Sequence, residues 1–258
     1  MSSALNGKFV WYELHTSDLD GAETFYGKVL GWTPRDAGVP DFRYTLNSAG
    51  DRDVTGMMTP MTPDSPRAWY GYIAVDDIDT AAAGVEKAGA TCLIPIHPIP
   101  GIGRFTMVSD PQGAVFALIQ YEAPEFPRPT VPTHGIHGHG WWRELHTSDQ
   151  NAAYDFYSGQ FGWGKGYAMD MEPIGVYQLL TPAEGGEGNG AMFNDRHRPP
   201  FWLFYFWVDD IDAAHEAVLA GGGKVVNGPM EVPSNAWVLE GRDPQGVTFA
   251  LVGYRKKK

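Results

Sequence analysis

Two pairs of side chains that can move protons occur in the sequence, Glu13 with His15 and Glu144 with His146. Residues two apart share one face of a β-strand. A carboxylate accepts hydrogen bonds and an imidazole titrates near neutral pH, so each pair offers a proton-transfer group or a contact for a polar ligand. A structural role competes with this interpretation, because Glu and His can also pair with each other to close a strand end. We take these four residues as catalytic or ligand-contacting candidates.

An aromatic residue precedes each pair by two positions, Trp11 in one case and Trp142 in the other. If the segments are strands, each face then carries a Trp–Glu–His row that combines an apolar wall with polar groups. Further candidates for ligand contacts are aromatic residues on other predicted strands and one basic residue that would suit an anionic group. These are Trp69, Tyr72, Arg104, Trp202 and Tyr205. Ordinary core or interface packing is the alternative for the aromatic ones.

The two rows belong to an internal repeat. The segment 11–18 recurs at 142–149, an offset of 142 − 11 = 131. Val75-Asp-Asp-Ile-Asp79 recurs at 208–212 and Asp110-Pro-Gln-Gly113 at 243–246, both at an offset of 133. Colinear matches of this kind indicate a tandem duplication. We predict an N-terminal domain at 1–122, a proline-rich linker at 123–138 and a C-terminal domain at 139–258.

Each copy contains two similar halves, in which a strand is followed by a helix and then by further strands. In the first half, Ser17 or Asp18 can cap the helix and Gly31 can end it. In the second half, Asp76 or Asp77 can cap the helix and Gly89 can end it. The strands predicted by β-branched and aromatic residues are 8–15, 42–47, 54–58, 69–75, 91–96, 104–108 and 115–121.

This order resembles the vicinal-oxygen-chelate superfamily, which contains glyoxalases, bleomycin resistance proteins and dioxygenases. The resemblance is carried by His15 to Trp32, by Val-Asp-Asp-Ile-Asp and by Asp-Pro-Gln-Gly with the strand after it, in both copies. Within the superfamily the chain is most similar to tandem two-domain bacterial glyoxalase-like proteins. The resemblance implies an α+β fold, in which paired βαβββ modules form a curled mixed sheet around a cavity.

The resemblance also implies where a metal would bind, because enzymes of this family hold a divalent ion through His, Gln or Glu. Aligned through the repeated motifs, those positions carry other residue types. They fall on Trp11, Trp142, Tyr72, Tyr205, Ala117 and Ala250, near Gly56 or Met57, and near Gly190 or Ala191. We therefore expect no metal and no other cofactor. The alternative is a divalent ion on Glu13 and His15, with His97 as a third ligand.

Composition excludes several classes of partner. The net charge is −12 and the one basic run is at 255–258, so we expect no nucleic-acid binding. No apolar stretch approaches the roughly 20 residues of a membrane span. A single cysteine, Cys92, excludes an internal disulfide and fits a cytoplasmic protein. It falls in an apolar strand, where we expect a buried thiol.

These observations predict a protein that binds a small organic molecule in aromatic-lined cavities. One alternative is a lyase, isomerase or dioxygenase-type enzyme with a nonstandard site built on the Glu–His rows. Another is a structural or partner-binding pair of domains. We expect the two copies to pair within the chain, and a homodimer remains an alternative.

Overall fold

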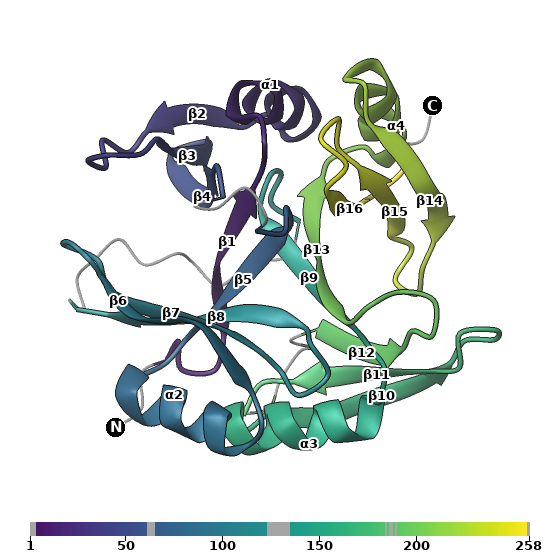
Figure 1. The fold of residues 1–258 in the computed structure, drawn as a ribbon. Coiled ribbons are helices and arrows are strands. Elements are labelled where there is room, and N and C mark those ends of the chain that lie inside the picture. The colour runs from purple at the N-terminus through teal and green to yellow at the C-terminus, as the bar shows by residue number, and fades with distance from the viewer. Residues whose placement is uncertain are drawn as a thin grey trace. The chain divides into compact units, whose positions relative to one another are not determined.

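The computed structural model describes residues 4–60, 65–122, 135–183, 185, 188 and 190–256. Two successive series of elements follow the repeat, and each has the order βαβββ twice (Figure 1). The first series is β1 (Phe9–His15), α1 (Leu19–Leu30), β2 (Thr33–Asp36), β3 (Tyr44–Ala49), β4 (Arg52–Met58), β5 (Trp69–Ala74), α2 (Ile78–Lys87), β6 (Thr91–Ile99), β7 (Gly103–Ser109) and β8 (Val115–Tyr121). The second is β9 (Gly140–Thr147), α3 (Gln150–Phe161), β10 (Gly164–Asp170), β11 (Val176–Thr181), β12 (Gly190–Asn194), β13 (Phe201–Val208), α4 (Ile211–Ala220), β14 (Lys224–Glu231), β15 (Trp237–Arg242) and β16 (Thr248–Gly253).

Each series forms a mixed eight-stranded sheet, in the orders β2-β3-β4-β1-β5-β8-β7-β6 and β10-β11-β12-β9-β13-β16-β15-β14. The first strand of a module pairs in parallel with its last strand, as β1 does with β4 and β5 with β8. The other strands of a module pair antiparallel, as β3 does with β4 and β7 with β8. The predicted α+β class and the duplicated βαβββ plan are confirmed.

Local chemistry explains why the helices lie where they do. All four begin after an aspartate whose side chain accepts a backbone N–H of the first turn, which satisfies a donor that the helix leaves unpaired. The caps are Asp18, Asp77, Asp149 and Asp210. Gly31 ends α1 in the left-handed conformation, with φ of 67°, which glycine adopts without a Cβ clash.

Two details differ from the sequence prediction. Strand β2 was not predicted, because all four of its side chains are exposed and give no alternating pattern. The expected burial of Cys92 is wrong, because the residue is exposed on β6. Strand β6 stands last in its sheet order, and all of its residues are exposed or half-buried. Most of the predicted linker, at 123–134, lies outside the described residues.

The chain divides into two compact units, and each takes half of its elements from each copy. One unit holds α2, β6–β8, α3 and β10–β12, and α2 lies beside α3 in it (Figure 1). The other holds α1, β2–β4, α4 and β14–β16, and α1 lies beside α4 in it (Figure 1).

A buried Trp–Tyr–Asp chain lies in the core of each unit. In the unit with α1 and α4, the indole N–H of Trp69 donates to the Tyr26 hydroxyl at 3.0 Å, and Tyr26 donates to Asp243 at 3.2 Å. In the unit with α2 and α3, Trp202 donates to Tyr157 at 2.9 Å, and Tyr157 donates to Asp110 at 3.0 Å. The tyrosine comes from one copy and the aspartate from the other. None of the helices in the described parts of the chain is long and apolar enough to cross a membrane.

Candidate functional site

The Glu–His pair of the first copy lies at the end of β1. Glu13 Oε1 is 2.8 Å from His15 Nε2, and both residues are buried, at 6% and 8% exposure. Leu14, between them, is completely buried and points to the opposite face of the strand, because strand side chains alternate. The two side chains therefore share one face of β1 and interact directly.

Tyr44 of β3 completes this group. Its hydroxyl donates to Glu13 Oε2 at 2.7 Å and accepts the indole N–H of Trp11 at 3.1 Å. Strand β4 lies between β3 and β1, and its Gly56 is opposite Glu13. A Cβ on Gly56 would overlap the Tyr44 hydroxyl, so glycine leaves the space through which Tyr44 reaches across β4.

These bonds set the direction of the hydrogen-bond chain. An indole N–H only donates, so the single proton of the Tyr44 hydroxyl is directed to Glu13. An ionised carboxylate only accepts, so the partner of Glu13 Oε1 is a proton on His15 Nε2. Neutral His15 then carries its lone pair on Nδ1.

Tyr70 of β5 packs against the imidazole of His15, with ring centroids 4.8 Å apart and the rings at 74°. Its hydroxyl donates to the carbonyl oxygen of Pro66 at 3.1 Å. Burial, and then the negative charge of Glu13, raise the pKa of Tyr70 to about 12. The phenol therefore stays neutral at physiological pH and provides a ring surface beside His15.

The second copy repeats the arrangement on β9. Tyr177 of β11 donates to Glu144 Oε2 at 2.7 Å, as Tyr44 does to Glu13. His146 Nε2 lies 2.9 Å from Glu144 Oε1. Nε2 is nevertheless one of the buried atoms without a hydrogen-bond partner. We therefore treat this contact as a close electrostatic one.

The surroundings of His146 differ from those of His15. Asp195 Oδ2 and Arg198 Nη2 each lie 2.9 Å from His146 Nδ1, and Arg198 Nε donates to the same carboxylate oxygen at 2.8 Å. The imidazole stacks on Phe201, with centroids 4.4 Å apart, and meets Phe193 edge-on at 4.5 Å. Its side chain is 1% exposed. Both ring nitrogens of His146 thus face protein groups.

Asp195 is held as an anion in this group. Burial raises the pKa of Asp195, but the hydrogen bonds from Arg198, His146 and the backbone N–H of His197 outweigh it and place the pKa below its usual range. The charge of the carboxylate is therefore kept even in mildly acidic solution.

The other residues predicted for the site lie in three kinds of place. Trp69 and Trp202 are buried in the two cores, where their indole N–H groups donate hydrogen bonds to the hydroxyls of Tyr26 and Tyr157. Arg104 contacts the side chains of Asp79, at 2.9 Å, and Gln120, at 3.0 Å. The remaining four residues lie on strands. Trp11 and Trp142 are half-buried, and Tyr72 and Tyr205 are buried.

Sequence reasoning missed Tyr44, Tyr177 and Asp195. The two tyrosines recur at an offset of 177 − 44 = 133, the same as the later motifs of the repeat. That match could have identified the two tyrosines, although a single aromatic residue on a strand more often belongs to the hydrophobic core. Asp195 gave no signal, because the first copy does not repeat it.

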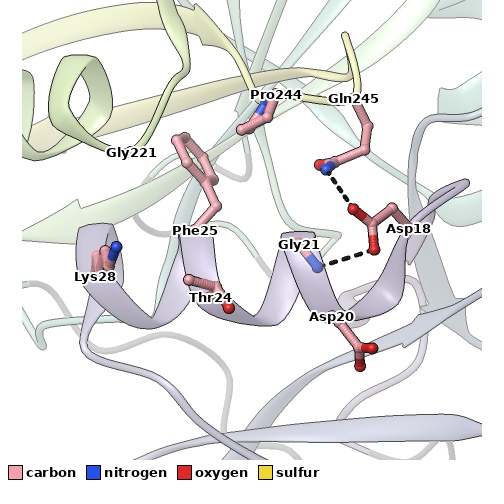
Figure 2. Close-up of a pocket in the computed structure, with 9 residues that line it drawn as sticks. All are labelled: Asp18, Asp20, Gly21, Thr24, Phe25, Lys28, Gly221, Pro244 and Gln245. Atoms are coloured by element: carbon pink, nitrogen blue, oxygen red, sulfur yellow. Dashed lines mark hydrogen bonds between the residues drawn. The ribbon is translucent and has the colours of Figure 1, made fainter.

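A surface pocket lies beside α1, away from the Glu–His residues. It has a volume of about 430 Å³ and runs between α1 and the turn that carries Gln245 (Figure 2). In it Gln245 points towards the cap residue Asp18, 3.4 Å away, and Asp18 also accepts the backbone N–H of Gly21 (Figure 2). None of the Glu–His residues lines this pocket, so we do not assign the function to it.

The model of one protein family matches most of the sequence. The description of that family is Glyoxalase/Bleomycin resistance protein/Dioxygenase superfamily, and it matches residues 8–118 and again 142–251. The chain belongs to this superfamily. The resemblance seen in the sequence is thereby confirmed for both copies.

Among similar superfamily members, "Putative glyoxylase CFP32" of Mycobacterium tuberculosis is 29% identical over 247 residues, covering 94% of this chain and 93% of that protein. "Anthracycline biosynthesis protein DnrV" of Streptomyces peucetius is also 29% identical and covers 97% and 94%. Among solved structures, the Mn(II)-bound glyoxalase of Novosphingobium aromaticivorans has a TM-score of 0.67 at 16% identity, covering 99% of this chain and 84% of that one. The 2,2',3-trihydroxybiphenyl 1,2-dioxygenase of Sphingomonas wittichii has a TM-score of 0.68 at 15% identity, covering 97% and 91%. The two structures support the fold alone.

The superfamily's metal can be tested against the residues present. The first-strand positions that the resemblance assigns to the metal carry Trp11 and Trp142. Of the other assigned positions, Tyr72 pairs with Ala117 and Tyr205 with Ala250. Glu13 and Glu144, two residues after the tryptophans, pair with Gly56 and Ala191. The side chains of tryptophan, glycine and alanine supply no ligand atom. The carboxylates of Glu13 and Glu144 lie beside the assigned positions, and each is already hydrogen-bonded to a tyrosine. Catalytic zinc sites use three protein ligands, and the described residues contain no group of three or more His, Cys, Asp or Glu side chains that could hold a metal ion. The residues at these positions do not fit the superfamily's metal.

Proposed function

We propose that this chain binds a small, flat organic molecule, with the Glu–His row of β1 as its polar contact. The observation that supports this proposal is the Trp11–Tyr44–Glu13–His15 hydrogen-bond chain, which fixes a carboxylate and an imidazole beside the ring of Tyr70. Sites for small molecules combine aromatic surfaces with a few polar groups of fixed orientation. One similar protein is named for anthracycline biosynthesis, and hydroxylated polycyclic aromatics are the ligands that we would try first.

Equilibrium dialysis against a panel of hydroxylated polycyclic aromatics tests this proposal. We expect saturable uptake of 2,6-dihydroxyanthraquinone and weaker uptake of anthraquinone, which lacks the hydroxyl donors. Preincubation with a chelator should leave the affinity unchanged, because we propose binding without a metal. Absence of uptake across the panel would contradict the proposed function, and uptake that requires an added divalent ion would contradict its metal-independence.

A second candidate function is an enzyme that transfers protons through the same row. The contact between Glu13 and His15 supports it, because a carboxylate that orients an imidazole is an arrangement used in acid–base catalysis. Products from the same panel, and from the hemithioacetal of methylglyoxal and glutathione, would be sought by mass spectrometry. Glu13→Gln should lower any turnover by about 10²-fold or more. Unchanged turnover in the Glu13→Gln, Glu144→Gln double variant would exclude this candidate.

A further inference from the structure

The two histidines of the rows differ in what their second nitrogen meets. His15 Nε2 faces Glu13, whereas Nδ1 makes no hydrogen bond or ion pair within the parts of the chain that the structure describes. Nδ1 is also not one of the buried, unpartnered nitrogens and oxygens found there. The atom therefore reaches solvent-accessible space with its lone pair available.

His146 has no such atom to offer. Its Nδ1 lies between Asp195 and Arg198, its Nε2 is buried beside Glu144, and Phe201 and Phe193 cover the ring. The side chain of His146 is 1% exposed, whereas that of His15 is 10% exposed. A ligand could reach His146 only by displacing the side chains that enclose it.

Strand register shows that the first copy lacks the residue that holds His146. Met58 pairs with His15 and Phe193 pairs with His146, so these two positions correspond. Two residues further along the chain the first copy has Pro60 where the second has Asp195. The side chain of proline has neither a carboxylate nor a hydrogen-bond donor, so it cannot form a hydrogen bond with Nδ1 of His15.

We infer that the two copies have divided their roles: the β1 row binds the ligand through His15 Nδ1, and the β9 row is a closed structural cluster that binds none. This inference rests on the proposed function. Because Nδ1 of neutral His15 accepts a hydrogen bond, the ligand class is a flat molecule with a hydroxyl or N–H donor, such as a phenol. One ligand binds per chain.

Titration of the full-length chain with 2,6-dihydroxyanthraquinone in a calorimeter tests the inference. Wild type should bind one equivalent. His15→Gln keeps a donor near the position of Nε2 and removes the acceptor at Nδ1, so it should weaken binding about tenfold, the effect of losing about 1.4 kcal/mol. His15→Asn places an amide oxygen near the position of Nδ1 and should retain more of the affinity than His15→Gln does.

The matched variant His146→Gln should bind like wild type with the same stoichiometry, but should unfold at a lower temperature. Without any ligand, diethyl pyrocarbonate should modify His15 faster than His146 in the folded chain, as read by peptide mass spectrometry. Two equivalents bound, equal modification rates, or undiminished binding by His15→Gln would overturn the division of roles while leaving the proposed function intact. Absence of probe binding by wild type would instead overturn the proposed function, and this inference with it.

Discussion

At the scale of single residues, the same Glu–His pair has two different environments. His15 keeps one nitrogen accessible beside Tyr70, whereas His146 is enclosed by Asp195, Arg198 and two phenylalanines. Hydrogen bonds to a charged group in a buried site contribute more to stability than those between neutral groups. Around His146 the hydrogen bonds of Asp195 with Arg198 and His146 connect the side chains of three residues, so their effect on the stability of the fold can be measured without knowing a ligand.

Asp195→Asn should lower the stability of the chain in a pH-dependent way. The folded pKa of Asp195 lies below its unfolded value of about 3.9, so its stabilisation is present above that value and is lost as the pH falls towards the folded pKa. We expect a loss of about 1.5–3 kcal/mol at pH 7, the range for hydrogen bonds to charged groups, and a shrinking difference below about pH 4.

Urea denaturation of Asp195→Asn and wild type at several pH values measures this effect. Asp51→Asn is the control, because Asp51 is exposed in the turn between β3 and β4. A difference from wild type that does not change between pH 7 and pH 3 would show that the charge of Asp195 is not responsible.

Gly56→Ala should displace Tyr44 from Glu13. The new methyl group would overlap the Tyr44 hydroxyl, and overpacking of this kind costs about 1–3 kcal/mol. Chemical denaturation measures the loss, and ligand affinity should fall with it. Gly159→Ala is the matched control, since an added Cβ there meets nothing within 4 Å and alanine favours the helix by roughly 0.5–1 kcal/mol. Equal effects of the two substitutions would refute the steric explanation.

At the scale of elements, the aspartate caps determine where the helices begin. Asp149 is a clear case, because its carboxylate accepts the backbone N–H groups of both Asn151 and Ala152, at 3.1 and 3.0 Å. Helix α3 has no acidic residue in its first turn and no basic residue in its last, so the cap is its main favourable interaction with the helix dipole.

Asp149→Ala should therefore lower the free energy of unfolding by about 1 kcal/mol, the usual cost of losing an N-cap. Asp149→Asn keeps an oxygen that can accept and should lose less. Thermal denaturation followed by circular dichroism compares the two variants. If both lose the same stability, the capping hydrogen bonds do not account for the effect.

At the scale of the whole molecule, each compact unit is assembled from both copies of the repeat. Tyr26 of the first copy reaches Asp243 of the second, and Tyr157 of the second reaches Asp110 of the first. The Phe-Tyr and Asp-Pro-Gln-Gly motifs of the repeat thus supply both partners of each contact. Burial, and then the neighbouring aspartate, raise the pKa of both tyrosines well above the usual value, so their hydroxyls remain donors.

A chain of residues 1–122 alone should therefore self-associate. It would lack Asp243 and Tyr157, and would leave Tyr26 and Asp110 without their partners. Two such chains can restore both contacts by pairing Tyr26 of each with Asp110 of the other, because Asp110 corresponds to Asp243 in the repeat. Light scattering after gel filtration should show a dimer. A stable, folded monomer would mean that the contacts between copies are dispensable.

Sequence alone determined the features that depend on near neighbours. The caps of α1 and α2, each predicted as one of two adjacent residues, and the placing of Glu13 with His15 on one strand face follow from residue type and spacing over a few positions. The repeat follows from direct comparison of segments 131 and 133 residues apart. A strand alternates and a helix needs a cap wherever it occurs, so these features were predicted correctly. Strand β2 was missed because its exposed side chains carry no such pattern.

Only the tertiary structure showed what surrounds the two rows. Tyr44 reaches Glu13 across 31 positions of sequence, and Asp195 reaches His146 across 49. Such contacts depend on strand register and on the path of the loops, which residue spacing does not encode. For the same reason Trp69 and Trp202, which are equally aromatic in the sequence, lie in the cores. The sequence thus determined the family and the two Glu–His rows. The packing around each histidine decided that Nδ1 of His15 is accessible and that Nδ1 of His146 is enclosed.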